Sequence, residues 1–572
     1  MLICIVMPDA ARGVVQAESG DSSAVRPFLD HLPARRYLWP ALVAFFLRIE
    51  WMLIAGTYAL YRGDAFDPWL YGFEMGSVAR SLSHGLGYSS PFYMFVGATG
   101  PTAWVTPLYP LLISAVIRVF GDFSLGSVLV LLGLNCALSA LTCILIYRIA
   151  EAAMGRRVAW LAAWTWALVP YFNRWHPWIW DVNLSALLLA TMFWLTLRAG
   201  EDGSWRSEVW LGGAAGLAVL SNPTLLIFLP VSLLWIACRR YKRNAGALNS
   251  RSHALDQHVL RPFLVVGAMV AILAMPWVVR NRMAFGQWVF LRTNFGTEFY
   301  LTNQHALAPT QWITRHPSLN WDEGTEYRTL GELAYNRDRM ARAVRYVREY
   351  PGEFASVTMK RVVAFWSGSI PTVFSDDHYW RFRLYVPLSV LGIAGLAITF
   401  ARRNAVFMLY FGLLLLYPAV FYITYPVPRQ RHAIEPILLV LACYAMSEFL
   451  FWIPRRIQSL KGLRANSRLA AGAGWFAVVL LLVSCGVAAL QRARARHPDS
   501  FVPQPTLSAE RFTAACGRPE QYAASGDVVE LDYQKAQVRV RIIAQTYGWV
   551  FDRRSGDLIT AAQSLACWQR SR

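Results

Sequence analysis

Two acidic side chains lie along the chain where carboxylates could do chemistry at a membrane surface. Glu74 precedes a short amphipathic segment near the end of the first apolar run, and Asp181 precedes a later apolar run, with Trp178 and Trp180 beside it. A carboxylate at this surface can meet a lipid-linked substrate, and an ionisable group at membrane depth predicts a functional role, so the two acids are candidates to converge in one site. The competing interpretations are a solvated interfacial acid for Glu74 and a helix N-cap for Asp181.

Four basic side chains form a second candidate set. Arg280 follows one apolar run, and Arg429, Arg431 and His432 lie together just before another. The planar guanidinium group matches the oxygen atoms of a phosphate, so we expect this set to bind a lipid phosphate or pyrophosphate. Binding to anionic lipid head groups is the alternative for each of them.

The composition indicates a membrane protein. Of the 572 residues, 56% are hydrophobic and 16% are charged, which is too apolar for an ordinary soluble enzyme. Many of the Lys and Arg residues behind the formal charge of +20 lie between apolar runs, where they indicate membrane topology and not a nucleic acid partner. A P-loop, a Gly-x-Ser-x-Gly elbow and a His-Glu-x-x-His motif are missing from the sequence, so ATP hydrolysis and zinc proteolysis lose support.

Membrane-spanning helices must position the candidate side chains. When the densest basic loops are assigned to the cytoplasm, the apolar runs alternate in direction and every candidate residue falls on the outer face. The fold class predicted is therefore an all-α polytopic membrane protein in the inner membrane, with its site facing the periplasm. The eleven predicted spans are 37–58, 124–147, 158–172, 184–197, 209–220, 225–237, 263–279, 384–400, 406–425, 433–451 and 470–490.

These spans divide the chain into three parts. We expect a cytoplasmic segment over residues 1–36, a transmembrane domain over 37–490 and an extracytoplasmic module over 491–572. The transmembrane domain carries two large outer loops, 62–121 and 280–383, in which we expect interfacial helices.

Local patterns predict some structure in these outer parts. Apolar residues recur at helical spacing across 331–350, which predicts a helix in the second loop. Alternation of Val538, Val540 and Ile542 predicts a small α/β or β module in the tail. Cys516 and Cys567 lie in this polar tail and could form a disulfide in an oxidising compartment.

A series of short motifs in a fixed order resembles the GT-C superfamily of membrane glycosyltransferases. The resemblance is to the family 39 branch, which contains protein O-mannosyltransferases and aminoarabinose transferases, and it covers about residues 38–451. It rests on the first-loop acid and then on Gly-Leu-Gly-Tyr (85–88), Gly-Pro-Thr-Ala-Trp (100–104), Pro-Leu-Tyr-Pro (107–110), the second acid, Ser-Asn-Pro (221–223), Pro-Trp-Val-Val-Arg-Asn (276–281) and Arg-Gln-Arg-His (429–432).

The resemblance implies roles for individual residues. Glu74 stands in the place of the family's catalytic base, which is usually an Asp, and Asp181 matches its second outer acid. Arg280 and Arg431 resemble its phosphate-binding residues. The implied reaction is transfer of a sugar from a polyprenyl-phosphate donor to an acceptor hydroxyl, with inversion at the anomeric carbon.

The implied partners are the lipid-linked donor, membrane lipids and an acceptor that is a lipid, a glycan or a protein. No cofactor is expected, while a metal ion shared by the two acids stays open. The alternatives are an oligosaccharide ligase or phosphotransferase that uses the same carrier, and a transporter or flippase of lipid-linked glycans. Pocket shape decides the sugar and the acceptor, so sequence does not name them.

Overall fold

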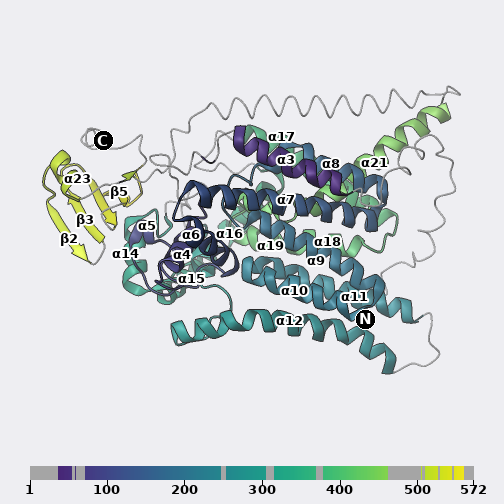
Figure 1. Cartoon of the computed structure of the whole chain (residues 1–572), viewed down its shortest axis with the longest axis horizontal. Coiled ribbons are helices and arrows are strands. Elements are labelled where there is room, and N and C mark those ends of the chain that lie inside the picture. Colours follow the sequence, from purple (N-terminus) through teal and green to yellow (C-terminus); the bar gives the residue numbers. More distant parts are fainter. Residues whose placement is uncertain are drawn as a thin grey trace.

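The computed structural model describes residues 37–54, 58, 71–245, 253–304, 315–368, 378–460, 504–505, 509–525, 528–543 and 547–559. They form an elongated bundle of helices with a small β-sheet at one end (Figure 1). The predicted cytoplasmic segment 1–36, the predicted span 470–490 and Cys567 lie outside the described residues.

The long axis of the bundle is built from apolar helices. Each predicted span from 37–58 to 433–451 coincides with a helix or with a pair of successive helices. These helices are α3 (Leu38–Ile54), α7 (Leu125–Met154), α8 (Arg156–Leu168), α9 (Val182–Asp202), α10 (Trp205–Ser221), η4 (Pro223–Ile227) with α11 (Phe228–Ala245), α12 (His253–Phe285), α17 (His378–Ala401), α18 (Phe407–Leu416) with α19 (Ala419–Ile423), and α21 (Glu435–Leu460).

Among the described residues, five segments are both long and apolar enough to cross a membrane. They are Leu125–Met154, Val182–Asp202, Pro223–Arg243, Leu260–Phe285 and Leu384–Ala401. The polytopic helical fold is thus confirmed in outline, and the total of eleven spans stays a prediction.

Small residues bring neighbouring helices of the bundle into close contact. A Cβ atom added at Gly212 or Gly216 of α10 would lie 2.6 Å or 2.5 Å from the side chains of Met269 and Leu273 on α12. Between α17 and α21, a Cβ at Gly395 would collide with the carbonyl oxygen of Leu441. Such small-residue faces are how membrane helices gain packing contacts without a hydrophobic driving force between them.

Backbone carbonyl groups accept from both terminal nitrogen atoms of Arg48, a charged residue inside α3. Arg48 is fully buried and donates hydrogen bonds to the carbonyl oxygen atoms of Ala44 at 2.9 Å and of Trp166, on α8, at 3.0 Å. A buried guanidinium is tolerated when its donors find partners. Arg48 therefore ties α3 to α8 and leaves the span intact.

Short helices gather at the end of the bundle that carries the sheet (Figure 1). Helix α15 confirms the helix predicted over 331–350. The helices outside the predicted spans are α4 (Glu74–Ser83), α5 (Tyr93–Val96), α6 (Leu108–Phe120), η3 (Pro170–Asn173), α13 (Phe295–Tyr300), α14 (Trp321–Leu330), α15 (Glu332–Glu349), α16 (Pro351–Ser367) and α20 (Pro428–His432).

The C-terminal module is an antiparallel sheet with one short helix. Its strand order is β1-β5-β4-β3-β2, and α23 (Ala509–Cys516) covers it. The predicted alternation is confirmed in β4, where the side chains of Val538, Val540 and Ile542 enter the module core. The strands are β1 (Gln504–Pro505), β2 (Gln521–Ser525), β3 (Val528–Tyr533), β4 (Val538–Ile543) and β5 (Tyr547–Asp552).

The module packs onto the short helices at this end of the bundle. The indole Nε1 of Trp549 donates to the carbonyl oxygen of Met94 at 2.6 Å, and its ring stacks on Phe95 at 4.4 Å between centroids. The amide of Leu558 donates to the carbonyl oxygen of Leu319 at 3.0 Å. The tail thus lies at the same end of the bundle as Glu74.

Candidate functional site

Glu74 is the first residue of α4, and a tight turn presents it. Gly72 has φ +80° and Phe73 has φ +47°, so the chain enters the helix through two successive left-handed residues. A non-glycine residue in this region costs about 1–3 kcal/mol and persists only where its surroundings hold it. The Phe73 ring is held by an edge contact with Phe95 and by a tilted contact with His316.

The same turn packs directly against the second acidic turn. A Cβ atom at Gly72 would lie 2.8 Å from the carbonyl oxygen of Ile179, so only glycine allows this approach. Ile179 is two residues before Asp181, as Gly72 is two residues before Glu74. The two predicted acids, about a hundred residues apart in sequence, therefore belong to touching turns.

Burial changes the acid–base behaviour of Glu74. Its side chain is 13% exposed, and this burial raises the pKa from 4.5 to about 7, against the opposing positive charges of Arg429 and Arg292. Desolvation disfavours the charged form of a carboxyl group, which is why the pKa rises. A carboxylate with a pKa near 7 is matched to general base work at neutral pH.

His316 faces Glu74 and is neutral. Its Nε2 lies 3.8 Å from Oε1 of Glu74, and burial, reinforced by the charge of Arg429, lowers the pKa of His316 from 6.5 to about 3. The backbone N–H of Ser318 donates to Nδ1, which assigns the proton of the neutral ring to Nε2. His316 thus points an N–H toward the carboxyl group without adding a positive charge.

Asp181 occupies the N-cap position of α9 without capping it. No side-chain capping bond is made there, and Oδ2 instead accepts from the hydroxyl of Ser185 at 3.5 Å. Asn222 donates to that same hydroxyl oxygen at 3.3 Å, which gives the Ser-Asn-Pro motif a role behind the acid. Burial raises the pKa of Asp181, and the charges of Arg292 and Arg429 oppose the rise.

Two arginines interact electrostatically with both carboxyl groups. Arg429 lies over the ring of Trp180 at 4.0 Å, next to Asp181, and Arg292 donates from Nε to the carbonyl oxygen of Trp104 at 2.9 Å. Each guanidinium lowers the pKa of Glu74 and of Asp181. The structure therefore brings together two carboxyl groups and two arginines, and each of the four side chains comes from a separate segment of the chain.

Arg280 takes a different position from the one expected. Its guanidinium donates to the carbonyl oxygen atoms of Thr102 at 2.6 Å and of Tyr88 at 2.5 Å. These residues belong to the Gly-Pro-Thr-Ala-Trp and Gly-Leu-Gly-Tyr motifs, so Arg280 fastens the first outer loop to α12. Its donors are directed at backbone carbonyls, which favours a structural role over the predicted binding of phosphate.

Arg431 and His432 also point away from the acids. Arg431 donates to the carbonyl oxygen atoms of Phe365 at 3.2 Å and Trp366 at 3.0 Å, and Nδ1 of His432 lies 2.7 Å from the carboxylate of Glu435. Both side chains are buried. Of the four basic residues predicted to bind phosphate, only Arg429 shares the surroundings of the acids.

Glu435 organises the segment that carries Arg429. Its carboxylate is fully buried and accepts from Arg174 at 2.8 Å and from the hydroxyl of Tyr171 at 2.6 Å. Arg174 and Tyr171 lie in the turn that leads to Asp181. Glu435 therefore fixes α20 against the second acidic turn, in a geometry that no local pattern in the sequence indicates.

Sequence reasoning missed Arg292, His316 and Glu332. Glu332 accepts hydrogen bonds from the amide of Ala103 at 2.7 Å, from the hydroxyl of Thr293 at 2.6 Å and from the hydroxyl of Thr102. Glu332 thereby joins the loop 62–121 to the segment that carries Arg292. All three lie in the second outer loop without a motif around them, and only their partners in the fold reveal them.

No group of three or more His, Cys, Asp or Glu side chains suited to a metal ion occurs among the described residues.

Residues 104–279 match the family model described as dolichyl-phosphate-mannose-protein mannosyltransferase. The matched segment includes Asp181 and ends one residue before Arg280, so it leaves out Glu74 and Arg429. A search of curated proteins gave no match.

Solved structures with a similar arrangement include two membrane proteins. The archaeal oligosaccharyltransferase AglB from Archaeoglobus fulgidus, in complex with an inhibitory peptide and a dolichol-phosphate, is 15% identical with a TM-score of 0.48, over 84% of this chain and 57% of that one. ArnT from Cupriavidus metallidurans bound to undecaprenyl phosphate is 12% identical with a TM-score of 0.29, over 72% of this chain and 77% of that one. The present chain thus spans little more than half of AglB, and nothing below rests on these two likenesses. Over residues 104–279 the chain is therefore similar to the dolichyl-phosphate-mannose-protein mannosyltransferases, in agreement with the resemblance to the family 39 branch that its sequence predicts.

Proposed function

We propose that the protein transfers a sugar from a polyprenyl-phosphate donor to an acceptor hydroxyl on the non-cytoplasmic face of the membrane. The observation that carries this proposal is the convergence of Glu74 and Asp181 with Arg292 and Arg429. A glycosyl transfer from a lipid phosphate needs a base for the acceptor and positive charge for the departing phosphate. This group of side chains supplies both.

Glu74 acts as the base. The acceptor oxygen attacks the anomeric carbon as its proton passes to the carboxylate of Glu74, and the bond from that carbon to the phosphate oxygen breaks. The leaving polyprenyl phosphate keeps the bonding electron pair, and the anomeric configuration inverts. A positioned base of this kind contributes about 10²–10⁴ in rate.

Arg429 and Arg292 stabilise the departing phosphate. Guanidinium groups are charged at every working pH and match phosphate oxygens with paired donors. They take the phosphate-binding role predicted for Arg280 and Arg431. Asp181, held by Ser185 beside these arginines, orients the acceptor or the sugar hydroxyls.

The positions of basic residues support the orientation. Arg239 of α11 pairs with Glu201 at 2.9 Å, at the end of α9 far from Asp181. Lys242 and Arg243 lie in the last turn of the same helix. The cytoplasmic side of a membrane protein is enriched in such residues, which favours the opposite, periplasmic side for Glu74.

The test uses the full chain in proteoliposomes with undecaprenyl-phosphate hexoses and pentoses labelled separately in the sugar and in the phosphate. Transfer of the sugar label without the phosphate label supports the proposal, and Glu74→Gln should abolish it. Glu349→Gln is the matched control, because Glu349 is an exposed carboxylate at the end of α15. Transfer of both labels would favour a phosphotransferase, and movement of intact donor across the bilayer without transfer would favour a flippase. Either result would overturn the proposal.

A further inference from the structure

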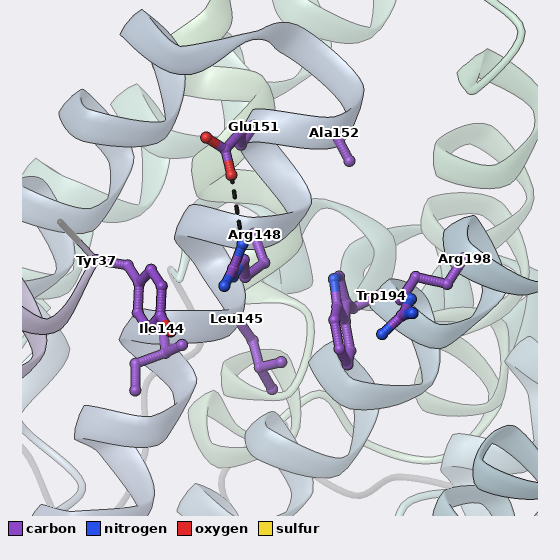
Figure 2. Close-up of a pocket in the computed structure, with 8 residues that line it drawn as sticks. All are labelled: Tyr37, Ile144, Leu145, Arg148, Glu151, Ala152, Trp194 and Arg198. Carbon is purple, nitrogen blue, oxygen red and sulfur yellow. Dashed lines mark ion pairs between the residues drawn. The ribbon is translucent and has the colours of Figure 1, made fainter. Parts of the chain in front are cut away.

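A pocket of about 590 Å³ opens at the end of the bundle opposite to Glu74. Figure 2 shows that it is formed where the start of α3 meets the last turns of α7 and the later part of α9. From Asp181 to Arg198 the chain rises by about 25 Å, at roughly 1.5 Å per residue of helix. The pocket and the candidate site thus lie at opposite borders of an apolar layer of about membrane thickness. The residues that line the pocket are Tyr37, Ile144, Leu145, Arg148, Glu151, Ala152, Trp194 and Arg198.

The two arginines of the pocket retain donors for a ligand. Arg148 lies 3.7 Å from Glu151, and Arg198 lies 4.0 Å from Asp202, so both carboxylates are beyond hydrogen-bond distance. The Asp202 carboxylate already accepts from the hydroxyl of Ser207 at 2.5 Å. The side chains of Arg148 and Arg198 are 39% and 56% exposed. They are accessible, and neighbouring acids do not saturate them.

The local charge is positive. Arg156 adds a third guanidinium, 3.8 Å from the same Glu151. Three arginines therefore surround two carboxylates at this corner of the bundle. An anion that enters the pocket gains more attraction than repulsion.

Aromatic rings fix the direction of both arginines. Arg148 lies over the ring of Tyr37 at 4.3 Å, and Arg198 lies over the ring of Trp194 at 5.2 Å. Figure 2 shows the Trp194 indole between the two guanidinium groups. Cation–π contacts orient a guanidinium without consuming its N–H donors. Tyr and Trp are also the residues that occupy the border between lipid tails and head groups.

The depth of the pocket is apolar. Ile144 and Leu145 line the pocket below Arg148. Leu141, one helical turn before Leu145 in α7, is 49% exposed on the bundle surface. A free inorganic anion would make no use of this surface. An amphiphile places its anionic head at the arginines and its acyl chain along α7.

We propose that this pocket binds the phosphate head group of an anionic membrane phospholipid in the leaflet opposite to the candidate active site. Arg148 and Arg198 donate hydrogen bonds to the phosphate. Tyr37 and Trp194 lie at the level of the glycerol, and Leu145 contacts the first part of an acyl chain. The site is independent of the glycosyl transfer proposed above, because no residue is shared.

The test is native mass spectrometry of the detergent-solubilised full chain titrated with phosphatidylglycerol, with phosphatidylcholine of the same acyl chains, and with inorganic phosphate. We expect phosphatidylglycerol to bind more tightly than phosphatidylcholine, and the double variant Arg148→Gln/Arg198→Gln to weaken it about 30-fold, as loss of two charges near a lipid surface predicts. Arg206→Gln is the matched control, since Arg206 is an exposed arginine over Trp205 at the start of α10, outside the pocket.

A second variant protects the test against misfolding. Leu145→Trp places an indole where the acyl chain would lie and keeps both arginines, so it should also weaken the preference for phosphatidylglycerol, while circular dichroism and gel filtration check the fold. Equal binding of the two lipids by the wild type, or unchanged binding in both pocket variants, would overturn the proposal. Displacement of bound phosphatidylglycerol by millimolar phosphate would show that the pocket takes the free anion and would equally refute a lipid site.

Discussion

Replacing Glu74 by Gln should remove activity and, at neutral pH, stabilise the protein. The folded-state pKa is about 7 and the ordinary value is 4.5. Between these values the folded state binds more protons than the unfolded state, so stability falls as the pH rises. Below pH 4.5 the stability is fully present, and above about 7 the loss is complete.

The magnitude follows from the interval of about 2.5 pH units, which corresponds to about 3 kcal/mol at roughly 1.4 kcal/mol per unit. The side chain is 13% exposed, so little solvent screening reduces this figure. Gln is neutral and of similar size, and it avoids the cost of a buried charge. Loss of function with a gain in stability is expected at sites where catalysis demands a strained or desolvated group.

The assay is the apparent Tm of wild type, Glu74→Gln and the control Glu349→Gln in the same detergent from pH 4.5 to 8.5, together with transfer rates. We expect the Tm of Glu74→Gln to exceed that of wild type by an amount that grows with pH and levels off above 7. Its rate should fall about 10²–10⁴-fold. Full activity in Glu74→Gln would refute the catalytic role, and a Tm difference that is flat across the pH range would refute the raised pKa.

Three further predictions concern the surroundings of this carboxyl group. Arg429→Gln should move the acidic limb of kcat/KM to higher pH, because the charge of Arg429 lowers the pKa of the base, and Arg429→Lys should move it less. Gly72→Ala should reduce transfer at least tenfold, whereas Gly85→Ala, with similar φ but open space around the added Cβ, should retain it. Trp549→Ala should cost about 3–5 kcal/mol of module docking and make the module easier for protease to cleave, while the exposed Tyr522→Ala should not.

Each of these has a result that contradicts it. An unchanged pH profile in the glutamine variant of Arg429 would separate that residue from the base. Equal activity of the two glycine variants would show that the contact between the acidic turns is dispensable. Identical proteolysis of the Trp549 and Tyr522 variants would show that the stacked indole does not hold the module.

Much of the architecture could be predicted from the sequence because its causes are local. Apolar run length located helices as far as residue 451, helical spacing located α15, and alternation located β4. Glu74, Asp181 and Arg429 were predicted as site residues because charged residues at the ends of apolar runs are conspicuous, and these roles stay predictions. The sequence pattern that indicates each of these three residues lies within a few residues of it.

The rest of the site depends on contacts between distant segments. Arg280 and Arg431 have the same local signature as Arg429, yet carbonyl oxygen atoms of other loops accept their hydrogen bonds, and only the packed chain shows this. Arg292 and His316 have no signature and become significant through the loops against which they pack.

The sequence by itself indicated a membrane protein, the positions of its described helices and the acids that stand at helix ends, because hydrophobicity and charge act along the chain. Only the tertiary structure decided that the turns of Glu74 and Asp181 touch, through Gly72 and the carbonyl oxygen of Ile179, and which arginines complete the site. The pKa of Glu74 belongs to this second group, since burial is a property of the packed chain and not of the residue.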